Sequence, residues 1–132
     1  MIALDTNVLV RFLTQDDAIQ SPAASGVIAR LTEKAPGYVC REVMVEMVWV
    51  LERAYGLDRV QVAIALEGLL AATEIEIETA DAVASALYRY RDDGFDFADL
   101  MIRAASIRSG AQVLVTFDRR AAKLPGVQLI GT

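Results

Sequence analysis

The chain begins MIALDTNVLV (residues 1–10), where one acidic residue, Asp5, separates two apolar segments. We predict a short buried strand over Met1–Leu4 and a helix from about Asn7 to Leu13. A carboxylate at this junction has two explanations. It either caps the helix that follows, or it belongs to a functional site whose other members lie further along the chain.

The length of 132 residues predicts a single domain, residues 1–132, which would bury about two thirds of its unfolded surface. The apolar fraction of 55% is high for such a domain, and part of this surface could lie in a dimer or partner interface. No segment reaches the roughly 18 uncharged apolar residues of a membrane span, and no basic-then-apolar leader opens the chain. The single cysteine, Cys40, cannot form an internal disulfide, so we expect a cytoplasmic protein.

The titratable residues restrict the chemistry that the chain can perform. The sequence contains no histidine and only two lysines, Lys34 and Lys123. This excludes serine–histidine–aspartate and cysteine–histidine mechanisms, histidine-based cleavage of RNA, and zinc sites built from histidine and cysteine. An enzyme of this composition would use carboxylates, which hold hard metal ions through oxygen. The net charge of -5 argues against an extended nucleic-acid surface, but not against a local site where a divalent cation reverses the sign.

Predicted strands and helices alternate along the chain, without a repeat or a linker. This order indicates the α/β class, as a three-layer α/β/α sandwich with a largely parallel central sheet. Ser21 and Pro22 fit the N-cap and first turn of the second helix, and Gly56 fits the end of the third. We expect the strand at 113–116 to be buried and that at 74–78 to lie at an edge. The other expected strands are 38–40 and 127–130, and the other helices are 22–34, 41–55, 58–72, 79–92 and 97–109.

Acidic residues follow the predicted strands or lie early in the neighbouring helices. Asp5 ends the first strand, Glu46 lies in the helix after the second, and Asp118 follows the fourth. Asp96 and Asp99 open the helix before the fourth strand. In right-handed β-α-β units these positions share the carboxyl edge of one sheet, where ligand sites lie. Converging carboxylates raise each other's pKa, and a divalent metal ion removes this conflict.

Each acid also has a purely structural explanation. Asp5 can cap the first helix, and Asp96 with Asp99 forms a D-x-x-D variant of the capping box. Asp118 can stabilise a turn. Glu46 is harder to explain in this way, because its neighbours in VMVEMVWVL are apolar all round and a lone buried carboxylate is costly. Capping therefore accounts for single acids, but not for the whole set.

Four segments resemble the successive motifs of the PIN-domain ribonucleases, and most closely those of the VapC-type toxins of bacterial toxin–antitoxin pairs. These segments are MIALDTNVLVRFL, EMVWVLERAYGL, DFADLMIRAA and VLVTFDRRAAKLPGV. They cover nearly the whole chain in the expected order. The resemblance matches the four acids of the family to Asp5, Glu46, Asp99 and Asp118, with no departure at these positions.

The resemblance implies endonucleolytic cleavage of RNA that depends on Mg²⁺ or Mn²⁺. One metal ion would bind mainly through Asp5 and Asp99, polarise the scissile phosphate and activate a water as the nucleophile. Glu46 and Asp118 would hold further waters, complete a second metal site or assist proton transfer. The resemblance also implies a homodimer and a small antitoxin whose tail covers the site.

Polar residues beside the four acids could support them. Those that could orient carboxylates or waters are Thr6, Asn7, Asp96 and Thr116. The candidate phosphate contacts are Arg11, Arg103 and Arg119, although each of them alone could be an ordinary solvated arginine.

Three alternatives remain open on the sequence alone. A receiver-like phosphosignalling domain also gathers acids around Mg²⁺, but it needs a lysine near the end of a late strand, where this chain has Phe117 and Asp118. A non-catalytic interaction module could retain the acids. Phosphodiester chemistry alone also does not distinguish RNA from DNA.

Overall fold

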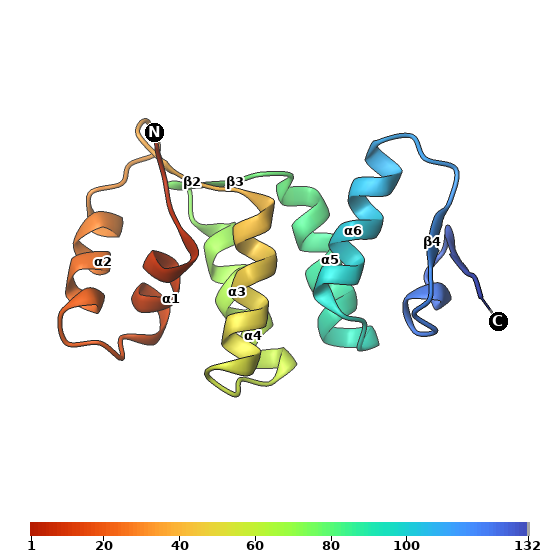
Figure 1. Ribbon diagram of the computed structural model, residues 1–132. Coiled ribbons are helices and arrows are strands. Elements are labelled where there is room, and N and C mark those ends of the chain that lie inside the picture. Colours follow the sequence, from red (N-terminus) through yellow and green to blue (C-terminus); the bar gives the residue numbers. More distant parts are fainter. Residues whose placement is uncertain (132) are drawn as a thin grey trace. The chain divides into compact units, whose positions relative to one another are not determined.

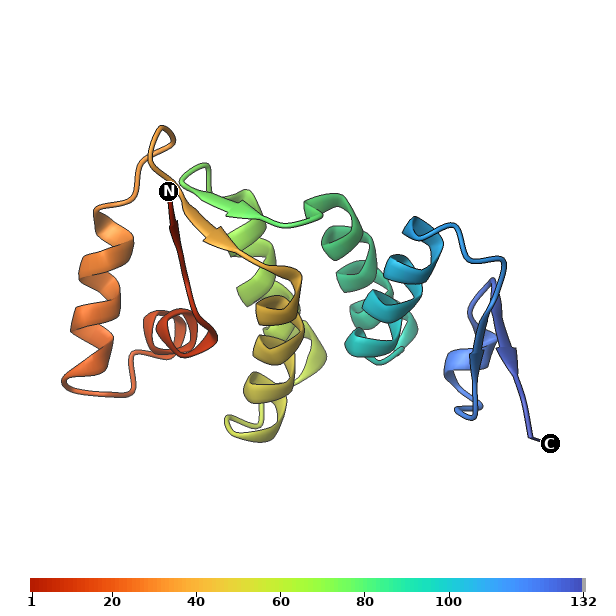
Figure 2. The ribbon, with the colours of Figure 1, turned by 45° about the horizontal axis from the view of Figure 1, so that its top comes forward.

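The computed structural model describes residues 1–131, which form two compact units (Figures 1 and 2). The first unit runs from Met1 to Asp81, and the second from Ala82 to the end of the chain. No helix within the described residues is long and apolar enough to cross a membrane.

The first unit is built on three parallel strands. The sheet order is β1-β2-β3, formed by β1 (Ile2–Ala3), β2 (Gly37–Val39) and β3 (Ile75–Ile77). Its helices are α1 (Thr6–Thr14), α2 (Gln20–Ala29), α3 (Arg41–Arg53) and α4 (Arg59–Ala71). In Figure 1, α1 lies beside α2, and α3 lies beside α4. The predicted alternation of strands and helices and the parallel pairing are therefore present in this unit.

Local hydrogen bonds explain where these helices begin. Asp58 and Gln61 form a capping box at the start of α4, the helix that was expected over 58–72. The expected edge strand is also present, because β3 is the last strand of the order and alternates buried Ile75 and Ile77 with exposed Glu76. At Gly37 a Cβ atom would lie 2.7 Å from Leu4 Cδ1, so a larger residue would require the Leu4 side chain to move where β2 passes it.

The predicted bounds of the second helix are wrong at both ends. Helix α2 begins at Gln20, before the expected N-cap Ser21. The reason is that Asp17 Oδ1 accepts from the backbone N–H of Gln20 at 2.6 Å, whereas Ser21 Oγ donates to the Arg11 carbonyl. The helix ends at Ala29 instead of Lys34, and paired backbone hydrogen bonds between Thr32 and Ala35 close a turn in the remaining segment.

The second unit contains two helices and a parallel strand pair. Its elements are most of α5 (Ala80–Asp93), α6 (Phe97–Arg108), β4 (Leu114–Thr116), a 3₁₀ turn η1 (Ala121–Lys123) and β5 (Val127–Leu129). β4 pairs with β5 in parallel. The core of this unit contains the edge-to-face rings of Tyr90 and Phe97, whose centroids lie 6.1 Å apart.

Two strands predicted to be buried are more exposed than expected within their own units. In β1, Ile2 is 50% exposed, and in β4, Val115 is 52% exposed. Both strands have a single hydrogen-bonded neighbour, since β1 pairs only with β2 and β4 only with β5 among the described residues. An apolar run therefore indicated a strand correctly, but not the number of its neighbours.

Candidate functional site

Asp5 lies where β1 leads into α1. It has extended backbone angles, and its Oδ1 accepts a hydrogen bond from the Thr6 backbone N–H at 2.7 Å. The predicted capping role is thus confirmed. The side chain is exposed, and its Oδ2 has no hydrogen-bond partner among residues 1–131. One oxygen of Asp5 serves the helix, and the other remains available to a ligand.

Glu46 is connected to the same segment through Thr6. The Thr6 side chain is buried, and its Oγ1 donates a hydrogen bond to Glu46 Oε1. Glu46 itself is exposed, because α3 buries a different face. The buried residues of that face are Met44, Met47, Val48 and Leu51. The prediction that Glu46 lies buried among apolar neighbours is therefore wrong, and the first unit instead brings Glu46 into contact with the residue next to Asp5.

Asp96 and Asp99 occupy the first turn of α6 in the second unit. Asp96 Oδ1 accepts from the Asp99 backbone N–H at 3.1 Å, which confirms the predicted cap. Burial raises the pKa of Asp99 above its ordinary value, and the negative charges of Asp96 and Asp118 raise it further. Asp99 and Asp118 therefore lie near enough to influence each other.

Asp118 begins the turn after β4. Its backbone N–H donates to Thr116 Oγ1 at 3.0 Å, and its Oδ1 accepts from the backbone N–H groups of Arg120 and Ala121 at 2.8 and 2.9 Å. The predicted turn-stabilising role is confirmed. The Thr116 hydroxyl thus contacts the backbone of Asp118 and helps to fix its conformation.

The donor set is suited to a hard divalent cation, although neither unit assembles a complete cage. Over residues 1–131, no three cysteine or acidic side chains lie close enough together to hold a metal ion. Mg²⁺ commonly binds through one or two carboxylates and retains several waters, so it does not need such a cage. A cation near Asp99 would also compensate the negative charge that raises the pKa of this residue.

Two of the three candidate phosphate contacts have partners within the protein. Arg11 forms an ion pair with Asp16 at 3.0 Å, and its Nε donates to Gln20. Arg103 Nε donates to the Pro125 carbonyl at 2.6 Å. Arg119 is exposed and has no hydrogen bond or ion pair among the described residues.

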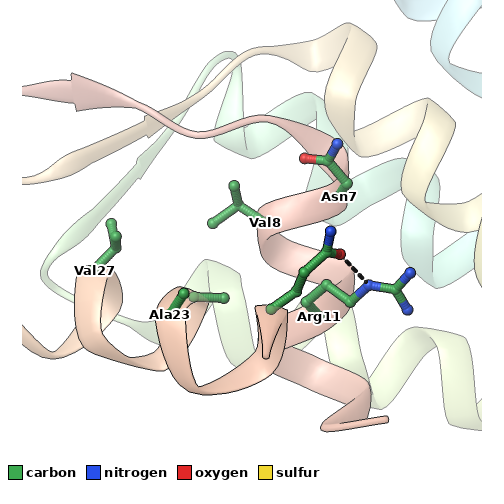
Figure 3. A pocket seen from close by; sticks show the side chains of 7 residues that line it. Asn7, Val8, Arg11, Ala23 and Val27 are labelled. Atoms are coloured by element: carbon green, nitrogen blue, oxygen red, sulfur yellow. Dashed lines mark hydrogen bonds between the residues drawn. The ribbon is translucent and has the colours of Figure 1, made fainter. Parts of the chain in front are cut away.

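Asn7 lies at a hollow between α1 and α2 (Figure 3). The hollow has a volume of about 280 Å³, and Val8 and Val27 provide part of its apolar wall. Arg11 and Gln20 also line the hollow, and the Arg11 Nε donates a hydrogen bond to Gln20 Oε1. Asn7 is exposed and makes no side-chain hydrogen bond among residues 1–131, so the structure assigns it no orienting contact with an acid.

Comparison with known proteins identifies the family. Residues 2–127 match the PIN domain family, and the chain therefore belongs to it. This match confirms the predicted fold class, an α/β/α sandwich of the PIN kind, and the family resemblance of the motifs. Among solved structures, the chain is similar to VapC20 of Mycobacterium tuberculosis, a toxin that cleaves the sarcin–ricin loop. The identity is 21% and the TM-score 0.48, over 99% of this chain and 100% of VapC20. No curated protein matches the sequence.

Proposed function

We propose that this protein is a metal-dependent endoribonuclease and the toxin of a toxin–antitoxin pair. The observation that carries the proposal is the PIN domain match, which extends over residues 2–127 and so includes every candidate acid. The four acids are Asp5, Glu46, Asp99 and Asp118. We further propose that residues 1–132 act as one nuclease domain, in which each of the four acids takes part in catalysis.

Asp5 and Asp99 are the proposed ligands of Mg²⁺ or Mn²⁺. When bound, the ion would stabilise negative charge on the scissile phosphate and make a water more nucleophilic. The hydrogen bond from Thr6 N–H to Asp5 Oδ1 supports this role, because it fixes the carboxylate and leaves Oδ2 available. The raised pKa of Asp99 also favours it, because a carboxylate in a negative environment gains from a nearby cation.

Glu46 and Asp118 are the proposed groups for positioning water and accepting its proton. Thr6 Oγ1 holds Glu46 Oε1, so Oε2 can accept a hydrogen bond from water. Two backbone N–H groups hold Asp118 Oδ1 and leave its Oδ2 for the same task. Because the sequence contains no histidine, the proposed proton acceptors are carboxylates.

Cleavage of labelled single-stranded RNA by the purified chain tests this proposal. We expect cleavage with Mg²⁺ or Mn²⁺, none with a chelator, and near-complete loss in Asp99→Asn. Asp58→Asn is the control, because it also replaces an aspartate with asparagine at the start of a helix, but at a residue that is no proposed metal ligand. Cleavage by Asp99→Asn at the rate of the parent would contradict the metal site. The cleavage rate of single-stranded DNA, measured in parallel, shows whether the protein distinguishes RNA from DNA.

The proposed partners are a second copy of the chain and a small antitoxin protein. Exposed apolar side chains support this proposal, since Trp49 and Ile64 are 56% and 63% exposed in the first unit. Light scattering on the purified chain, and co-expression with the product of a neighbouring small reading frame, test it. A fully active monomer at micromolar concentration that binds no such product would contradict both partners.

A further inference from the structure

Two arginines pack against one aromatic ring in the second unit. The guanidinium carbon of Arg120 lies 5.0 Å from the centroid of the Phe95 ring, and that of Arg89 lies 5.9 Å from it. Arg120 Nη2 also donates to the Asp93 carbonyl at 2.8 Å. Because of the ring and this hydrogen bond, the guanidinium of Arg120 has a defined position although the residue is exposed.

The two guanidinium groups are not neutralised by the protein. Neither Arg89 nor Arg120 forms an ion pair with a carboxylate among residues 1–131. Two positive charges at one ring repel each other, and an anion that contacts both would relieve this repulsion. The whole chain carries a net charge of -5, so two neighbouring arginines without a carboxylate partner differ from the acidic character of the protein as a whole.

This pair lies beside two of the proposed catalytic acids. The Arg120 backbone N–H donates to Asp118 Oδ1, and Phe95 directly precedes Asp96, which caps the helix that carries Asp99. Arg89 also lines a hollow of about 220 Å³ between α5 and α6, together with Ser85 and Arg103. Arg89 therefore contacts the Phe95 ring and also shares this hollow with another arginine, Arg103.

We propose that Arg89 and Arg120 bind a phosphate of the RNA chain next to the one that is cleaved. Guanidinium groups suit this role because their planar N–H donors match phosphate oxygens in bidentate contacts. The acids of the site would otherwise repel the RNA backbone. The proposal rests on the ribonuclease function, but it concerns binding and can be tested without cleavage.

The test measures the affinity for a fluorescein-labelled single-stranded RNA in the presence of a chelator, which prevents metal-dependent cleavage. We expect Arg89→Gln and Arg120→Gln each to weaken binding about tenfold, the loss expected for a charge-assisted hydrogen bond. The slope of log affinity against log salt should fall by about 0.7 for each phosphate that the variant no longer neutralises. Arg120→Lys should lose part of the affinity but keep the slope, because the charge remains.

Arg108→Gln is the matched control, because Arg108 is an exposed arginine of the same unit that contacts neither the ring nor the hollow. The proposal is overturned if the Arg89→Gln/Arg120→Gln double variant matches this control in affinity and salt slope, or if the parent does not bind RNA. If the double variant loses binding while the parent fails to cleave with metal, the phosphate site stands and the nuclease proposal fails. Unchanged melting temperatures in the variants confirm that the weaker binding does not come from unfolding.

Discussion

Asp5 is predicted to act both as a helix cap and as a metal ligand, and two substitutions separate these roles. Asn at this position keeps an oxygen that can accept from the Thr6 N–H, which lies 2.7 Å from Asp5 Oδ1, but it loses the charge. Ala loses both the acceptor and the charge. Asp5→Asn should therefore keep the stability of the metal-free protein, and Asp5→Ala should reduce it.

The size of both effects follows from the capping bond and from the length of the chain. Loss of an N-cap acceptor costs about 1 kcal/mol. For a chain of 132 residues, this corresponds to a decrease in melting temperature of about 3–5 °C. A metal ion at a hundredfold excess over its dissociation constant stabilises the parent by about 2.7 kcal/mol, which corresponds to a rise of about 10 °C.

Thermal unfolding of the parent and both variants, with a chelator and with saturating Mn²⁺, measures these shifts. We expect the rise with metal in the parent to shrink sharply in both variants, although only Asp5→Ala starts from a lower melting temperature. Asp58→Asn provides the control, since it changes an N-cap carboxylate in the first unit that is no proposed ligand. A full metal-induced rise in Asp5→Asn would contradict the ligand role, because the ion would then bind elsewhere and Asp5 would be a cap alone.

Three further predictions concern individual side chains of the two units. Thr6→Val should reduce RNA cleavage, whereas Thr6→Ser should retain it, because the hydroxyl donates a hydrogen bond to Glu46 Oε1. Equal cleavage rates in the two variants would contradict this positioning role. Asp99→Asn should raise the melting temperature of the metal-free protein at neutral pH, because the raised pKa means that the ionised carboxylate destabilises the fold. This gain in melting temperature should vanish as the pH falls below the ordinary carboxylate pKa. A gain that does not depend on pH would count against this explanation. Asp16→Asn should lower the melting temperature at neutral pH, because hydrogen bonds, first that from the Thr14 hydroxyl, lower the pKa of Asp16 to about 2. The difference from the parent should shrink progressively as the pH falls below the ordinary value of 3.8 and be lost as it falls through about 2; an unchanged difference below that pH would contradict it.

Local patterns in the sequence predicted most of the secondary structure because their causes are local. Asp96 and Asp99 lie within one helical turn, so their spacing alone indicates the hydrogen bond. The start of α2 was predicted wrongly because two local acceptors compete there. Asp17 Oδ1 accepts from the Gln20 backbone N–H, whereas Ser21 Oγ donates to the carbonyl of Arg11, which lies ten residues earlier in the sequence.

Contacts between distant segments could not be predicted in this way. Thr6 and Glu46 are separated by 40 positions, and their hydrogen bond exists only because α1 packs against α3. The exposure of Glu46 depends on the same packing, which decides which face of a valine-rich helix is buried. Arg120 was not among the predicted phosphate contacts, because its importance comes from Phe95 and Asp93, more than twenty residues earlier in the chain.

The structural and functional explanations of the acids are compatible. A carboxylate has two oxygens, and at Asp5 and Asp118 backbone N–H groups occupy Oδ1 and leave Oδ2 available. Thr6 does the same for Glu46 through its hydroxyl. Such bonds restrict the rotation of each side chain before any ligand arrives, so less conformational entropy is lost when a cation or water binds. The capping pattern that first offered an ordinary explanation for Asp5 is thus a means of holding this acid ready for the proposed chemistry.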